Sequence, residues 1–159
     1  MEFMFESYIV YGLIATLIMT IAMYIAVAMG IPLDLTWMLG LAFVKPRHKA
    51  TVYITGSTLQ FVNGAVFGIV YGVCFALLGF SEGEWWWGMA FGAVHGVLAG
   101  ILLGMMPVFH PRIGTGKDKL PPPGYFGRQL SSLNPAVLII LHLIYGTFFG
   151  AMYNPLTPG

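Results

Sequence analysis

Residues 85–109 read WWWGMAFGAVHGVLAGILLGMMPVF, an apolar stretch without a charged side chain. At about 1.5 Å of rise per residue, an α-helix of this length crosses the roughly 30 Å hydrocarbon core of a bilayer. A glycine stands at every fourth position, so small residues share one helix face and another backbone can approach closely. The stretch therefore predicts a membrane-spanning helix at the centre of a bundle. Its glycines are Gly88, Gly92, Gly96, Gly100 and Gly104.

Three further stretches, residues 7–30, 52–80 and 135–153, are also apolar and long enough to span a bilayer. The whole chain is 58% apolar and only 8% charged, whereas soluble domains carry about 25% charged residues. This composition excludes a soluble globular domain, and the 15% aromatic share excludes a disordered chain. We therefore predict an all-α integral membrane protein in which residues 1–159 form a single domain of four transmembrane helices.

The charged residues are sorted by loop. All 7 Lys and Arg residues lie in two loops, 31–51 and 110–134, which the positive-inside rule places in the cytoplasm. Most acids lie before residue 7 or in the turn 81–84, so both termini and this turn are expected on the outer side. The prediction is a multi-pass protein of the cell (inner, cytoplasmic) membrane, N-out and C-out. The cations are Lys45, Arg47, Lys49, Arg112, Lys117, Lys119 and Arg128.

The two predicted cytoplasmic loops carry structural signals of their own. Asp34 is placed to cap a short helix that ends at Lys45-Pro46, and we expect this helix to lie in the cytoplasmic membrane interface. In the second loop, residues 121–124 read PPPG, which favours the extended polyproline conformation. We expect this proline run to project from the bundle and to contact a partner.

The second and fourth spans share a pattern, since residues 59–68 read LQFVNGAVFG and residues 141–150 read LHLIYGTFFG. Each span also follows a loop that holds a Pro-Arg pair and a His. The pattern predicts a duplicated two-helix hairpin, with two parallel copies related by an axis along the membrane normal. Chance recurrence of a Gly-Phe-Gly pattern is the alternative. The glycines of these two spans that are expected to pack helices are Gly64, Gly68, Gly72, Gly146 and Gly150.

Two histidines lie deep in the predicted spans. His95 lies about 12 Å from the outer edge and His142 about 10 Å from the inner edge, both on faces that carry glycines. Ionisable side chains are costly in hydrocarbon, so these two residues are candidates for function. Further polar side chains at compatible depths, which we expect to be buried, are Gln60, Asn63 and Tyr145.

The histidine pair has three interpretations. Two inward imidazoles beside glycines and aromatic rings suit axial ligation of haem b or coordination of a chlorophyll-type ring. Arg47 and Arg112 would then hold the propionates, or else contact lipid phosphate. The second interpretation is hydrogen bonding between helices, and the third is a metal ion or a proton path. No Asp or Glu lies in any predicted span to support a His ligand.

Other classes of function lack a signal in the sequence. A net charge of +1 provides no basic patch for nucleic acid, and the single Cys74 cannot form an internal disulfide. The chain has no His-Glu-x-x-His motif, no nucleophile–base pair and no soluble catalytic domain. We therefore predict no enzymatic activity of its own.

These observations support three functions. The first is an accessory subunit of a larger redox or energy-converting membrane complex, which packs through its glycine-lined faces against other integral membrane subunits and binds lipids. The second is a cofactor-bearing redox or pigment subunit, active in electron transport, with His95 and His142 as metal ligands. The third is an oligomeric channel or carrier whose flux depends on Gln60, Asn63 or His142.

Overall fold

The computed structural model describes residues 4–117 and 119–154, and within them the fold is helical. The elements are α1 (Phe5–Ala28), α2 (Leu35–Leu41), α3 (Lys49–Leu78), α4 (Trp85–Phe109), the short 3-10 helix η1 (Tyr125–Gly127) and α5 (Asn134–Met152). The four long helices are long and apolar enough to cross a membrane, and they match the four predicted spans to within a few residues at each end. The chain is therefore a multi-pass α-helical membrane protein.

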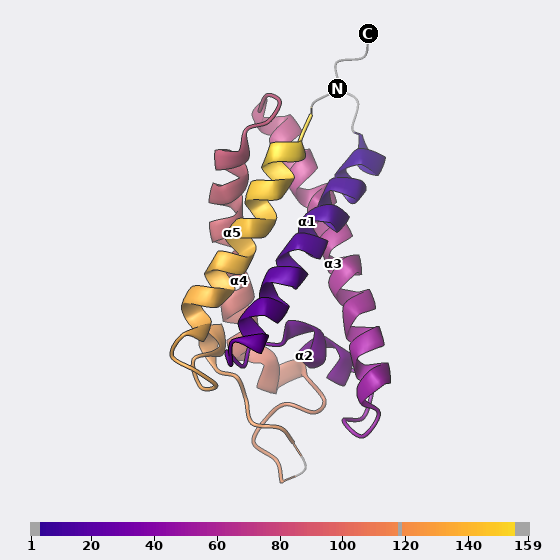
Figure 1. The fold of residues 1–159 in the computed structure, drawn as a ribbon, viewed down its shortest axis with the longest axis vertical. Coiled ribbons are helices and arrows are strands. Elements are labelled where there is room, and N and C mark those ends of the chain that lie inside the picture. The colour runs from indigo at the N-terminus through magenta and orange to yellow at the C-terminus, as the bar shows by residue number, and fades with distance from the viewer. Residues whose placement is uncertain (1–3, 118, 155–159) are drawn as a thin grey trace.

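Figure 1 shows the four long helices side by side, with α2 across one end of the bundle. Loop residues 29–48, 110–117 and 119–133 lie at this end, which we call the basic end because it holds the Lys and Arg residues. The turn 79–84 and the first and last described residues lie at the opposite end, which we call the acidic end. The two sets of loops therefore lie at opposite ends of the bundle.

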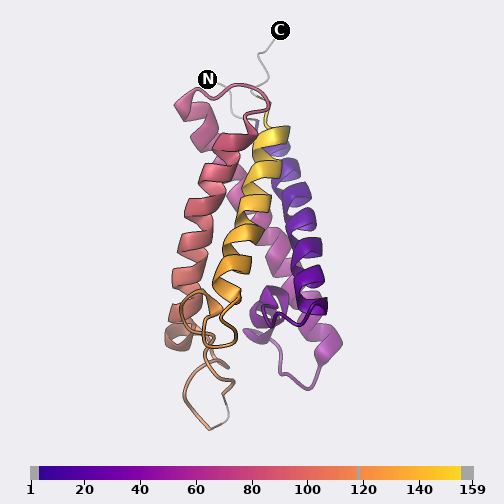
Figure 2. The ribbon, with the colours of Figure 1, turned by 60° about the vertical axis from the view of Figure 1, so that its left-hand side comes forward.

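Glycines determine which helices pack closely. α1 packs against both α3 and α5, and α5 also packs against α4 (Figures 1 and 2). A Cβ on Gly88 of α4 would overlap the carbonyl oxygen of Gly146 of α5, and a Cβ on Gly12 of α1 would overlap that of Gly64 of α3. These backbones can touch because the residues at the contacts have no side chain. The glycine-lined faces are thus occupied by helices of the same chain.

The end of the α4 glycine series has a different partner. Gly100 faces the ring of Phe126, and Gly104 faces the ring of Tyr125, so aromatic side chains of the second loop fill this part of the face. Pro123 is buried in the same loop. The prediction that the whole proline run projects from the bundle is therefore wrong at Pro123, because the glycine face of α4 gives the adjoining rings a place to pack. Contact of this loop with a partner stays a prediction.

The short helix α2 begins as predicted. Asp34 caps it by accepting a hydrogen bond from the backbone N–H of Trp37 at 2.8 Å. The helix ends at Leu41, earlier than predicted, and it packs against α3. The reason for this packing is another pair of glycines, since a Cβ on Gly40 or Gly56 would overlap backbone of the other helix.

Helices α3 and α4 meet through side chains instead of glycines. Near the acidic end, Phe91 of α4 contacts Tyr71 and Phe75 of α3, with ring centroids 5.5 and 5.2 Å apart. Phe80 stacks on Trp87 at 4.7 Å where the two helices are joined. The bulk of these rings keeps the α3 and α4 backbones apart, and towards the basic end the separation leaves a cavity.

Candidate functional site

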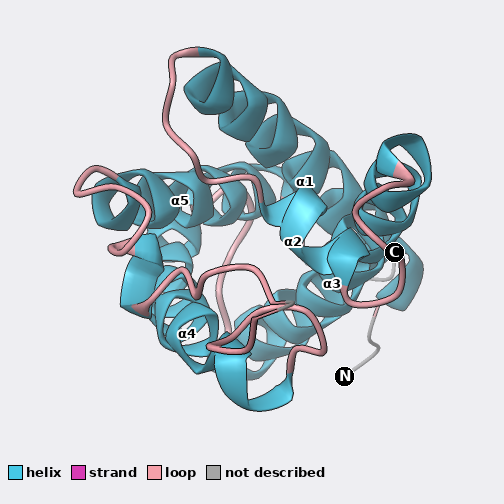
Figure 3. Cartoon of the chain, turned by 90° about the horizontal axis from the view of Figure 1, so that it is seen from below, coloured by secondary structure: helices cyan, strands magenta, loops and turns pink. Residues whose placement is uncertain are grey.

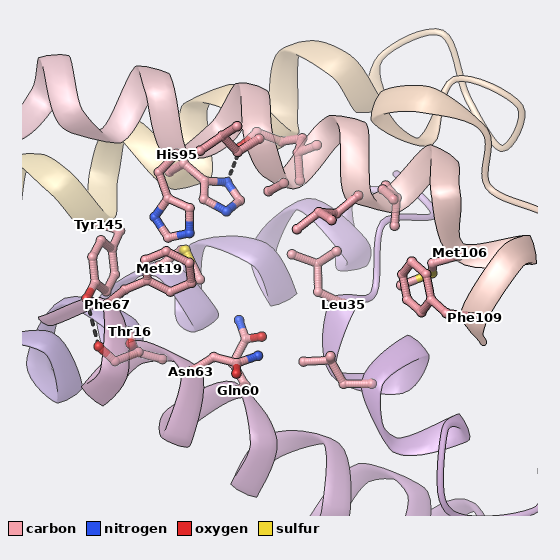
Figure 4. Close-up of a pocket in the computed structure, with 18 residues that line it drawn as sticks. Thr16, Met19, Leu35, Gln60, Asn63, Phe67, His95, Met106, Phe109 and Tyr145 are labelled. Carbon is pink, nitrogen blue, oxygen red and sulfur yellow. Dashed lines mark hydrogen bonds between the residues drawn. The ribbon is translucent and has the colours of Figure 1, made fainter. Parts of the chain in front are cut away.

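A cavity of about 280 Å³ lies between α3 and α4 (Figure 4). Its other walls come from α1, α5 and α2, so all five described α-helices contribute to it. Most of the lining is apolar and includes Met19, Leu35, Leu39, Phe67, Leu98, Ala99, Leu102, Leu103, Met106, Phe109 and Leu138. The polar lining residues are Thr16, Gln60, Asn63, His95, His142 and Tyr145. The fold thus gathers all five polar candidates of the sequence in one place.

Gln60 is the polar group with the least support from the protein. Its side chain is only 6% exposed, and its Nε2 has no hydrogen-bond partner in the part of the chain that the structure describes. Figure 4 shows its amide pointing from α3 into the cavity. An unsatisfied buried amide costs about 1–3 kcal/mol, so Gln60 is a donor available to a ligand.

Asn63 lies one turn further along α3 and points to the same cavity (Figure 4). It is exposed, which corrects the expectation that it is buried. The cause is the separation of α3 from α4, because Leu98 and Leu102 on the α4 side of the cavity are also more than half exposed. The cavity is therefore open sideways, towards the region that lipid occupies around a transmembrane bundle.

His142 presents an acceptor to the cavity. Its Nδ1 lies 2.8 Å from the carbonyl oxygen of Leu138, one turn earlier on α5, so Nδ1 donates this bond. A neutral imidazole with its proton on Nδ1 has a bare Nε2 that can only accept. His142 is 5% exposed and lines the cavity, so Nε2 and the Gln60 amide form a complementary acceptor and donor.

His95 is held by aromatic neighbours on α3. Its ring stacks on Phe67 with centroids 3.9 Å apart, and its Nδ1 lies 3.3 Å from the hydroxyl of Tyr71. The ring also meets His142 edge to face, with centroids 4.6 Å apart. The structure therefore brings the two predicted histidines together at the wall of the cavity.

This arrangement does not fit axial ligation of a haem by both histidines. Metal–imidazole bonds are about 2 Å long, so two imidazoles on opposite sides of one metal have centroids about 6 Å apart, farther than the observed 4.6 Å. A Cβ on Gly92 would overlap the carbonyl oxygen of His142, so no flat ring fits between α4 and α5 there. Among the described residues, no group of three or more His, Cys, Asp or Glu is arranged to hold a metal ion.

Arg47 and Arg112 lie together, but at a second pocket near the basic end and not at the histidine cavity. Arg112 donates a hydrogen bond to the carbonyl oxygen of Leu41 at the end of α2. Arg47 donates from Nε to Nε2 of His48 at 3.0 Å. The two arginines therefore do not share a pocket with His95 and His142.

Tyr145 joins two sides of the cavity. It is 1% exposed, and its hydroxyl donates to the carbonyl oxygen of Gly64 at 2.8 Å, which links α5 to α3. Leu35 and Leu39 of α2, which were not predicted as site residues, also line the cavity. No local signal marks them, because they reach the cavity only through the packing of α2 on α3.

His110 is a further residue whose environment the sequence did not reveal. It is 5% exposed, and its Nδ1 accepts from the N–H of Arg112 at 3.2 Å. That leaves the proton of a neutral ring on Nε2, which donates to the carbonyl oxygen of Met38 at 3.1 Å. His110 therefore ties the end of α4 to α2, at the basic end of the cavity.

Comparison with known proteins identifies no relative of this chain. No protein-family model matches the chain, and no curated protein or solved structure matches it significantly. The cavity and its side chains are therefore the features of this protein that indicate a function.

Proposed function

We propose that this multi-pass membrane protein binds a small, uncharged, amphipathic ligand in the cavity between α3 and α4. The observation that carries the proposal is the buried Gln60 amide, whose Nε2 has no partner within the described residues and points into the cavity. Leaving such a donor unpaired is costly in a low-dielectric interior, and a ligand acceptor would remove the cost. The cavity is close to the lower end of the roughly 300–1,000 Å³ range of small-molecule sites.

The lining restricts the chemistry of the ligand. Gln60 supplies a donor and His142 Nε2 an acceptor, so a ligand that carries a carbonyl and a hydroxyl group would satisfy both. No Asp, Glu, Lys or Arg is among the described residues that line the cavity, which favours an uncharged polar group. An apolar tail would lie along Leu98 and Leu102 and leave through the open side of the cavity into lipid.

A ligand site of this kind is compatible with two of the functions expected from the sequence, the carrier and the accessory subunit. A carrier needs such a binding site, and Gln60, Asn63 and His142, the residues predicted to control flux, all line it. A place beside larger redox or energy-converting subunits in the cell membrane, with the basic end in the cytoplasm, also remains part of the proposal. Partner subunits would then contact exposed apolar surface, because the glycine faces are used within the chain.

The packing supports the proposal that the chain contains a duplicated hairpin. Gly12 of α1 contacts Gly64 and Gly68 of α3, while Gly88 of α4 contacts Gly146 and Gly150 of α5. The α3 and α5 glycines are the pairs that the sequence pattern aligns. Two antiparallel helix pairs closed by equivalent glycines are what an α1–α3 copy and an α4–α5 copy would give.

The test is to identify the small molecules that co-purify with the protein from its native membrane. The wild type and three variants are each purified in mild detergent, and the organic extract of each protein is analysed by mass spectrometry. Ala99→Phe fills the cavity, Gln60→Leu removes the donor, and Ala90→Phe adds the same ring at an exposed position of the same helix. We expect a near-stoichiometric amphipathic species that is lost in Ala99→Phe, at least about tenfold depleted in Gln60→Leu and retained in Ala90→Phe.

Two outcomes would contradict the proposal. One is the same lipid profile in all variants, provided that each elutes as a folded species in size-exclusion chromatography. The other is a colourless, ligand-free chain that co-purifies stoichiometrically with larger membrane subunits, which would support the accessory function alone.

A further inference from the structure

A second pocket, of about 570 Å³, lies at the basic end. It is separate from the ligand cavity, since no residue lines both pockets. Two loops far apart in the sequence form it, one before α3 and one after α4, and Figure 3 shows this end of the bundle face on. Five cations line the pocket together with Leu120 and Pro46, namely Lys45, Arg47, Arg112, Lys117 and Lys119.

Like charges gathered in one pocket repel one another unless an anion lies between them. No acid is among the described residues that line it, and Asp118 lies outside the described residues. Asp34, the described acid of the first loop, is occupied elsewhere, because its carboxylate accepts hydrogen bonds from Thr36, Trp37 and Tyr53. The cations therefore lack a described carboxylate to neutralise them within the pocket.

We propose that this pocket binds the phosphate group of an anionic membrane lipid. Arg and Lys side chains are the groups that recognise phosphate oxygens, Arg through a two-pronged guanidinium and Lys as a point charge. The lipid source follows from apolar side chains close in sequence to the lining residues Lys45 and Arg112, since Phe43, Val108 and Phe109 are 69%, 82% and 59% exposed. Apolar side chains at this level would enter the acyl region and hold the cations at the depth of the headgroups.

A phosphate bound in this pocket would affect the ligand cavity indirectly, through contacts with α2. Arg112 lines the pocket and donates to the carbonyl oxygen of Leu41, the last residue of α2. Two residues earlier, His110 donates to the carbonyl oxygen of Met38 in the same helix. Since Leu35 and Leu39 of α2 line the cavity, lipid at the pocket stabilises one wall of that cavity.

The experiment measures lipid binding to the full chain in detergent by native mass spectrometry. Phosphatidylglycerol is compared with phosphatidylcholine for the wild type and for two double variants of equal charge. Lys117→Gln with Lys119→Gln removes two pocket cations, whereas Lys49→Gln with Arg128→Gln removes two exposed cations outside the pocket. Inorganic phosphate is titrated against the bound lipid in a parallel series.

We expect the wild type to bind phosphatidylglycerol at least about tenfold more tightly than phosphatidylcholine. The Lys117/Lys119 variant should lose most of this preference, and the Lys49/Arg128 variant should keep it. Equal losses in the two variants would overturn the proposal, because the effect would then be one of net charge. Displacement of the lipid by millimolar inorganic phosphate would overturn the assignment to a membrane lipid and indicate a soluble phosphate compound.

Discussion

The imidazole rings of His95 and His142 meet edge to face, with centroids 4.6 Å apart and ring planes at 73°. The contact joins α4 to α5 and depends on Gly92, where a side chain would overlap the carbonyl oxygen of His142. Because the helices are this close, the rings occupy the space that a metal between them would need. They form one wall of a cavity whose opposite wall carries the Gln60 amide.

Replacement of His95 by Phe tests the cofactor interpretation directly. We expect His95→Phe to leave the visible absorption spectrum of the purified protein unchanged, oxidised or reduced with dithionite, because the ring packs against Phe67 and His142. Phe keeps the aromatic packing while it removes both ring nitrogens. The control is Tyr125→Phe at an exposed position. A visible band that bleaches or shifts in His95→Phe and not in the control would show that a tetrapyrrole is bound at His95.

Replacement of Gly88 by Ala tests the glycine contact between α4 and α5. A Cβ at this position would overlap the backbone of Gly146, which cannot move away cheaply. We expect Gly88→Ala to lower the free energy of unfolding in detergent by about 1–3 kcal/mol, measured by thermal or denaturant unfolding. The control is Gly96→Ala on the same helix, whose Cβ would lie 3.1 Å from side-chain atoms of His142 and Ile139. Equal losses in the two variants would argue against a backbone contact at Gly88.

His110 gives the basic end a dependence on pH. Burial lowers the pKa of His110 below its ordinary value, and the nearby Arg112 and Lys119 lower it further, although the hydrogen bond to Met38 opposes them. The folded chain therefore keeps His110 neutral at a pH where the unfolded chain has already bound a proton. Stability from this residue is present above the ordinary His pKa of about 6.5. It is lost as the pH falls below that value towards the lower pKa of the folded state.

The measurement is the thermal midpoint of the purified protein between pH 7.5 and pH 5 for the wild type, His110→Gln and His48→Gln. We expect His110→Gln to reduce the fall in midpoint across this range, since Gln cannot take up the proton. His48 is exposed, so His48→Gln should behave like the wild type. A wild-type slope in His110→Gln would show that other groups cause the pH dependence.

Features that depend on neighbours along the chain could be predicted from the sequence. The four spans follow from apolar length alone, because a helix satisfies its own backbone hydrogen bonds in lipid whatever it packs against. The cap at Asp34 needs only a carboxylate three residues before Trp37. The depth of His95 and His142 likewise follows from their position within a span, so these two residues were recognisable as candidates.

The site itself was decided by contacts between residues far apart in the sequence. Gly12 with Gly64, and Gly88 with Gly146, bring α1 to α3 and α4 to α5, whereas bulky rings keep α3 from α4. The cavity, the exposure of Asn63 and the separation of Arg47 and Arg112 from the histidines all follow from that pairing. Every one of these helices is apolar and carries glycine or other small residues, so periodicity alone does not say which faces meet. Only close packing in three dimensions selects among them, because the van der Waals gain depends on the shapes of both partners.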